Sequence, residues 1–154
     1  MLPHKHFVYG ILLSLILVLI MPQIGFIGVS LIILSTVLID FDHYVYYFYK
    51  KQDFNLINAF NFFKNNRKKF LALPVEKRAH YSGAWCMFHG VEALAIALIL
   101  TFLLSEYFGF VFIGMAFHLL IDYIEQWNFY SRFDRISSAY DFLKFRKLKD
   151  INEI

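Results

Sequence analysis

The sequence predicts an all-α integral membrane protein, a bundle of four transmembrane helices, and three observations lead to this prediction. Of the 154 residues, 59% are hydrophobic and 18% are charged, whereas a soluble domain is about 45–50% apolar and about 25% charged. The apolar residues are gathered in four long segments, and the lysines and arginines are confined to three other regions. A chain of this length has room for one domain, which we expect over residues 1–154.

The four transmembrane helices are expected at about residues 4–21, 24–49, 82–105 and 108–128. A spanning helix needs about 20 residues, and the apolar cores Phe7–Met21 and Phe26–Ile39 are shorter than that. The first two helices therefore span only if they extend beyond these cores, and a re-entrant hairpin over 7–39 is the alternative. The apolar run continues after Pro22-Gln23 without a small-residue cleavage site, so we expect a retained segment rather than a signal peptide.

The basic residues predict the orientation of the helices. All fifteen lie at Lys5, between Lys50 and Arg78, or between Arg132 and Lys149. The two short breaks at Met21–Gly25 and Leu104–Gly109 contain none. Because short loops rich in Lys and Arg stay in the cytoplasm, four crossings place both termini on the cytoplasmic side of the cell (inner) membrane.

Two of the basic regions, 54–73 and the C-terminal tail 137–149, are predicted to form amphipathic helices at the membrane surface. The first has four apolar residues at helical spacing, followed by basic ones. These four are Leu56, Ile57, Phe60 and Phe63. In the tail, Ser137 or Ser138 is a candidate N-cap. The anionic inner leaflet attracts such segments, and a solvated basic loop is the alternative for each.

Ionisable residues interrupt the apolar segments only near the end of the bundle that is expected to face the cytoplasm. They are His4 and His6 in the first helix, Asp40, Asp42 and His43 at the end of the second, His89 and Glu92 in the third, and His118 and Asp122 in the fourth. Pairs within the last three helices are spaced i,i+3 or i,i+4, so each pair shares a helix face. Asp42 lies off that face, so it either contacts a ligand rather than the ion or needs a local bend.

This convergence predicts a metal site. A charge buried in hydrocarbon costs about 2.5–3.5 kcal/mol or more, and a divalent cation would offset several such charges together. The candidate ligands are His6, Asp40, Asp42, His43, His89, Glu92, His118 and Asp122. Carboxylates and imidazoles suit one or two ions of Zn, Mn, Fe or Mg, with Zn as the first choice. Two alternatives need no metal. His118 and Asp122 could form a hydrogen-bonded pair within the membrane, and Asp40, Asp42 and His43 could form a polar end of the second helix. Cys86 is the only cysteine, so neither a disulfide nor a Cys-rich zinc knuckle is expected.

Three motifs resemble the YdjM-like family of small inner-membrane proteins, which are regarded as metal-dependent hydrolases. The motifs are "HFVYG" from His6, "DFDH" from Asp40 and "HLLID" from His118, and the resemblance covers residues 4–125. It implies site roles for the His and Asp residues of these motifs, and for His89. Where the family commonly has His-Arg-Gly-x-Thr-His-Ser, this chain has "MFHGVEA". A role for Glu92 therefore rests on spacing alone.

The favoured function is a membrane-embedded hydrolase of a phosphoester in a lipid or amphiphilic substrate at the cytoplasmic face. One or two metal ions would lower the pKa of a bound water towards ~7 and polarise the phosphoryl oxygen. Asp42 or Glu92 would act as general base, and Arg132 and Arg135 would bind the anionic headgroup. Membrane lipid is the expected partner, and nucleic acid is not. The alternatives are a metal-stapled structural or partner-binding membrane protein and a non-catalytic metal or ion carrier.

Overall fold

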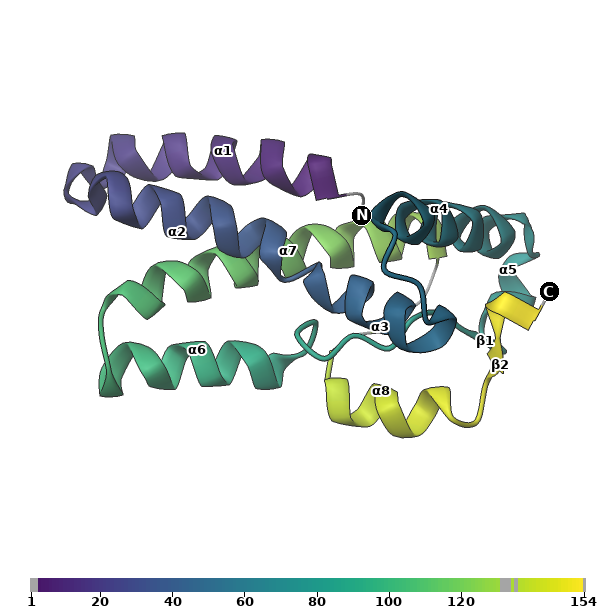
Figure 1. Ribbon diagram of the computed structural model, residues 1–154. Coiled ribbons are helices and arrows are strands. Elements are labelled where there is room, and N and C mark those ends of the chain that lie inside the picture. Colours follow the sequence, from purple (N-terminus) through teal and green to yellow (C-terminus); the bar gives the residue numbers. More distant parts are fainter. Residues whose placement is uncertain (1–2, 131–133, 135, 154) are drawn as a thin grey trace. The chain divides into compact units, whose positions relative to one another are not determined.

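The computed structural model describes residues 3–130, 134 and 136–153, and most of these are helical (Figure 1). The prediction of an all-α protein is confirmed for this part of the chain. Contacts between residues group the chain into two compact units. The first unit consists of Met1–Asp40 and Val91–Ile124, and the second of Phe41–Gly90 and Glu125–Ile154.

The first unit is built from apolar helices. Its elements are α1 (Pro3–Ile20), the short 3-10 helix η1 (Pro22–Ile24), α2 (Gly25–Leu38), α6 (Val91–Leu103) and the first part of α7 (Tyr107–Tyr130). Pro22 opens η1, and Gly25 adopts a φ of 63°, a conformation that glycine reaches without strain. These two residues reverse the chain, so that α1 and α2 form an antiparallel hairpin (Figure 1).

Small residues allow α1, α2 and α7 to approach one another closely. A Cβ atom on Gly10 would lie 2.4 Å from Thr36 Oγ1. A Cβ atom on Gly114 would lie 1.9 Å from Ser35 Oγ and 2.5 Å from the carbonyl oxygen of Ile32. Small residues at such contacts are typical of helices that pack in membranes. Both α1 and α7 are therefore held against α2 with no space for a side chain between them.

Two helical segments, Pro22–Lys51 and Tyr107–Asn128, are long and apolar enough to cross a membrane. Only 33% and 22% of their most apolar windows are buried, whereas the core helix of a soluble protein is mostly buried. The apolar helices His4–Ile20 and Val91–Leu103 are shorter. With 13 residues, α6 is about 20 Å long, less than the ~30 Å hydrocarbon layer. Two candidate spans are present, and four crossings stay a prediction.

The second unit contains the more polar elements. They are α3 (Phe41–Lys51), α4 (Leu56–Ala72), α5 (Val75–Arg78), β1 (Tyr81–Ser82), the end of α7, α8 (Ser138–Phe145), β2 (Lys149–Asp150) and the 3-10 helix η2 (Ile151–Glu153). The side chain of Asn55 caps α4 by accepting hydrogen bonds from two backbone N–H groups, and Ser137 caps α8 in the same way. The helices predicted over 54–73 and 137–149 are thus present. The second ends early because β2 pairs with β1 in parallel. Their place at a membrane surface stays a prediction.

One predicted transmembrane helix is wrong in its extent. The helix expected over 82–105 begins only at Val91, and residues 83–90 are irregular. Hydrogen bonds to two residues distant in sequence, Asp42 and Ser138, hold that irregular segment. The helix expected over 24–49 lies within the helical segment Pro22–Lys51, in which a turn at residues 39–40 separates α2 from α3.

Candidate metal centre

Four ionisable side chains of the first unit lie together and are buried. His6 comes from α1, Asp40 from the turn that follows α2, and His118 and Asp122 from α7. The side chains of His6 and His118 have no exposed surface, while those of Asp122 and Asp40 are 2% and 9% exposed. We call these four residues the first group.

The close helix contacts position this group. Each close contact involves a small residue located four residues, or about one helical turn, from a member of the group. The pairs are Gly10 with His6, Thr36 with Asp40, and Gly114 with His118. Because the backbones meet one turn away, the ionisable side chains on the facing surfaces are brought within a few ångströms of one another. The "HFVYG" motif therefore has a structural meaning, since its glycine sets how closely its histidine approaches α2.

The distances within the first group are longer than those of typical hydrogen bonds and suit a shared ion. Nε2 of His6 lies 3.3 Å from Asp122 Oδ1 and 3.9 Å from Asp40 Oδ2. Nε2 of His118 lies 3.6 Å from Asp122 Oδ2 and 3.7 Å from Asp40 Oδ1. An N–H···O hydrogen bond is normally about 2.9–3.0 Å long. Two ligand atoms at about 2.0–2.2 Å from one tetrahedral zinc ion are about 3.3–3.6 Å apart.

Hydrogen bonding fixes the tautomer of His118. Its Nδ1–H donates to the backbone carbonyl oxygen of Thr36 at 2.8 Å, which leaves the lone pair of the neutral ring on Nε2. A histidine that binds metal usually has one ring nitrogen bonded to a carbonyl and binds through the other. Nε2 of His118 lies near the carboxylates of Asp40 and Asp122, and either a proton or a cation between these atoms would make the contact favourable.

His6 gives the strongest indication of an ion. Its ring is fully buried, and within the described part of the chain neither ring nitrogen makes a hydrogen bond. Buried polar side-chain atoms nearly always have a partner, and leaving one without costs about 1–3 kcal/mol. The ring also stacks on that of His118, with centroids 3.7 Å apart. A divalent cation held by these two imidazoles and two carboxylates fits the atoms present.

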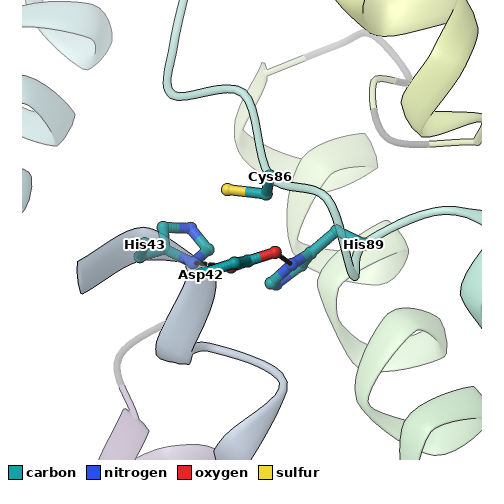
Figure 2. A group of neighbouring side chains, drawn as sticks. All are labelled: Asp42, His43, Cys86 and His89. Atoms are coloured by element: carbon teal, nitrogen blue, oxygen red, sulfur yellow. Dashed lines mark hydrogen bonds and ion pairs between the residues drawn. The ribbon is translucent and has the colours of Figure 1, made fainter. Parts of the chain in front are cut away.

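A second group lies in the other unit and consists of Asp42, His43, Cys86 and His89 (Figure 2). The Asp42 carboxylate accepts hydrogen bonds from Nδ1 of His43 at 3.1 Å and from Nδ1 of His89 at 3.0 Å. It also accepts one from the backbone N–H of Phe88 at 2.9 Å. One possible ligand atom from each member of the group lies within 4.8 Å of the others. These residues could therefore also hold a metal ion.

The structure divides the predicted ligands between the two groups. Asp40 belongs to the first group, and Asp42 and His43 to the second, because the chain turns at residues 39–40. A local bend was one of two alternatives for Asp42, and its hydrogen bonds to His43 and His89 fit the other alternative, contact with the ligands. The three hydrogen bonds that Asp42 accepts favour a role in orienting the histidines over a role as metal ligand or general base. The convergence of all the predicted ligands on a single centre stays a prediction.

The structure brings Glu92 into neither group. It lies half-buried in the first turn of α6. The expectation that His89 and Glu92 share one helix face is wrong, because His89 precedes the start of α6 at Val91. Glu92 as ligand or general base stays a prediction. The predicted substrate-binding residues Arg132 and Arg135 lie outside the described residues.

Sequence reasoning missed Cys86, which it considered only as a possible disulfide or zinc-knuckle residue. The signal was the Cys-x2-His spacing of "CMFH", which brings a thiol and an imidazole together when the backbone turns between them. It also missed Thr36, which accepts a hydrogen bond from His118 through its backbone carbonyl oxygen. Any residue type could provide this oxygen, so the sequence does not reveal it.

Comparison of the chain with protein-family models, with curated proteins and with solved structures found no match. The resemblance to the YdjM-like family stays a prediction that rests on its three motifs. A metal centre is supported by the geometry of the two groups.

Proposed function

We propose that the chain is a membrane-embedded, metal-dependent hydrolase that cleaves a phosphoester in a lipid or amphiphilic substrate. The observation that carries this proposal is the first group. His6, His118 and Asp122 are buried and form a candidate metal group, and Asp40 lies 3.7–3.9 Å from the two imidazoles. Among the described residues His6 has no hydrogen bond there. Zinc is the first choice for this set of donors, and manganese and iron also suit it.

Within the first group, some residues would bind the ion and one would accept a proton. His6 and His118 would hold the ion, His118 through Nε2 because its Nδ1–H is bonded to Thr36. When bound, a divalent ion supplies activation of water near pH ~7 and polarisation of a phosphoryl oxygen. Asp40 is the least buried member of the group, and a carboxylate oxygen of Asp40 that does not bind the ion is the best placed to accept a proton from water.

The exposed surface of the first unit supports a membrane setting. Three large apolar side chains in or next to the turns that follow α1 and α6 are more than 80% exposed. They are Leu19, Phe26 and Phe102. Contiguous exposed apolar surface marks contact with a membrane or a partner, and the low charge of these helices favours lipid. We extend this to the inner membrane, with four crossings and both termini in the cytoplasm, on the one-sided distribution of lysine and arginine.

The class of substrate follows from where the groups lie in the chain. The ionisable residues sit at the ends of the apolar helices that adjoin the basic segments. The exposed lysines Lys64, Lys68 and Lys69 on α4 are suited to anionic headgroups. A phosphoester whose lipid part stays in the bilayer fits both features of the sequence, the buried metal ligands at the helix ends and the basic segments that follow them in the chain.

The test uses the full-length protein purified in detergent and loaded with zinc or manganese. Phosphate release is measured with an aryl phosphomonoester, an aryl phosphodiester and a phospholipid. We expect turnover that chelation abolishes and added metal restores, and that His118→Ala removes. The exposed His80 provides the matched control, since His80→Ala should keep full activity. A protein that holds metal and turns over none of the three substrates would contradict the proposal and favour the metal-stapled structural protein.

A further inference from the structure

We propose that Cys86, His43 and His89 form a second metal site, specific for zinc or another borderline-soft divalent ion, in which Asp42 orients both imidazoles. This site lies within the second unit and is independent of the proposed hydrolysis at the first group. The polar ends of the apolar helices would then carry two sites of different chemistry.

The arrangement of the second group supports this proposal. Cys86, His89 and Asp42 are all less than a tenth exposed. The two imidazole rings meet edge to face, with centroids 4.8 Å apart. In Figure 2 they lie on either side of the Asp42 carboxylate, and the thiol of Cys86 lies beside them. A buried thiol beside two imidazoles is a set of donors that zinc prefers.

The hydrogen bonds of Asp42 set the orientation and the tautomer of both histidines. A carboxylate only accepts, so His43 and His89 each donate through Nδ1–H and keep the lone pair of the neutral ring on Nε2. Carboxylates that orient histidine ligands in this way are the usual outer partners of zinc sites. Asp42 holds two such rings at once. Its third bond, from Phe88, fixes the backbone next to His89.

The backbone around Cys86 is held in place on both sides. Nε1–H of Trp85 donates to the carbonyl oxygen of Ser138 at 2.8 Å, and Oγ–H of Ser138 donates to the carbonyl oxygen of Met87 at 2.8 Å. The N-terminus of α8 thus braces the residues before and after Cys86, and the Phe88–Asp42 bond braces the next one. These contacts stabilise an irregular path that brings the thiol to the histidines.

The competing explanation treats Cys86 as a small buried hydrophobic residue. Free thiols commonly fill such positions, and its sulfur lies 3.8 Å from the carbonyl oxygen of Ala84, a contact that a neutral thiol makes. Two oriented imidazoles at the same place favour the ligand. On binding, the thiol would lose its proton to solvent and bind as a thiolate. Thiolate favours zinc and disfavours magnesium and manganese, which prefer oxygen.

The proposal is tested by cobalt substitution in the full-length protein, stripped of metal and kept in detergent. Cobalt bound to a thiolate gives a sulfur-to-metal charge-transfer band in the near ultraviolet, and cobalt bound only to nitrogen and oxygen does not. We expect this band in the wild-type protein and its loss in Cys86→Ser. We also expect Cys86→Ser to weaken zinc binding by more than the ~10–100-fold that loss of an orienting partner costs.

The control variant is His6→Ala, because among the described residues His6 shares a candidate metal group with His118 and Asp122 but not with Cys86, His43 or His89. This variant should keep the band. A wild-type protein that binds cobalt without the band would overturn the proposal, and this result needs no variant to fold. Unchanged zinc content and affinity in Cys86→Ser would also overturn it. Neither outcome bears on phosphoester turnover, so failure of this proposal is distinguishable from failure of the proposed function.

Discussion

The two groups contain similar residues but differ in how their polar atoms are hydrogen-bonded. In the second group the carboxylate of Asp42 accepts three hydrogen bonds of 2.9–3.1 Å, and both histidines have their Nδ1–H atoms bonded. In the first group the contacts between imidazole and carboxylate are 3.3–3.9 Å long, and His6 makes no hydrogen bond within the described residues. The second group is held together by protein hydrogen bonds, whereas the first group could be completed by a cation.

This difference shows that residue type alone does not indicate what a buried polar cluster requires. A group whose members are already bonded to one another can bind metal or do without it, and in the second group Cys86 is what favours metal. A group that buries a polar side chain with no hydrogen bond among the described residues, as the first group does with His6, is costly to bury until an ion is bound. Substitutions in each group, with and without metal, test this distinction.

Replacement of Gly114 by alanine should have the largest effect. Its Cβ would lie 2.5 Å from the backbone oxygen of Ile32, so α7 must move away from α2, which typically costs about 1–3 kcal/mol. Because His118 lies one turn away, Gly114→Ala should also lose metal from the first group. Thermal unfolding and metal analysis measure both effects. Gly83→Ala is the control, since its Cβ would meet nothing within 4 Å. A Gly114→Ala protein with full metal content would contradict the positioning role of the glycine.

Replacement of Asp122 by asparagine should destabilise the protein when metal is bound, but not when metal is removed. With metal at about 100 times its Kd, binding contributes about 2.7 kcal/mol, and loss of a ligand should forfeit much of this. Without metal, the amide of asparagine can donate to the lone pair on His118 Nε2, so Asp122→Asn should be as stable as the wild-type protein or more stable. Denaturant unfolding with and without a chelator measures this. Equal destabilisation in both conditions would show that the first group is satisfied without an ion.

Replacement of Asp42 by asparagine should destabilise the protein whether metal is present or not. Asparagine has one acceptor oxygen, and its NH2 group would face donors in His43, His89 and Phe88. Leaving a buried donor unpaired costs about 1–3 kcal/mol, so the free energy of unfolding should fall by that order in both conditions. The matched comparison is Asp122→Asn under the same two conditions. If Asp42→Asn destabilised the protein only in the presence of metal, the second group, like the first, would depend on a bound ion.

The smallest effect concerns Asp150, a carboxylate of the second unit outside both groups. Burial raises its pKa, but hydrogen bonds from Lys50 and Asn152 outweigh burial and hold the pKa below its usual value. Its contribution to stability is therefore present above the unfolded pKa of about 3.9 and lost as the pH falls through the lower folded value. In metal-free protein, Asp150→Asn should flatten the acid branch of the stability profile. An unchanged acid branch would rule out this contribution.

The sequence predicted the helical class and the buried polar residues at the helix ends, because hydrophobic patterning and isolated charges are local signals. It did not predict the irregular path of residues 83–90. That segment is apolar enough for a helix, but partners far away in sequence, Asp42 and Ser138, hold it. For the same reason the pairing of His89 with Glu92 was wrong and Cys86 was missed. The turn at residues 39–40, which assigns Asp40 and Asp42 to different groups, also depends on packing rather than on turn-forming residues.

The most direct test of the central claim is the metal content of the wild-type protein, purified at full length in detergent and measured by elemental analysis. We expect at least one tightly bound divalent ion per chain, lost from the first group in His6→Ala and kept in His80→Ala. A folded wild-type protein that contains no metal as purified, and takes up none from zinc or manganese solutions, would show that the first group is not a metal site.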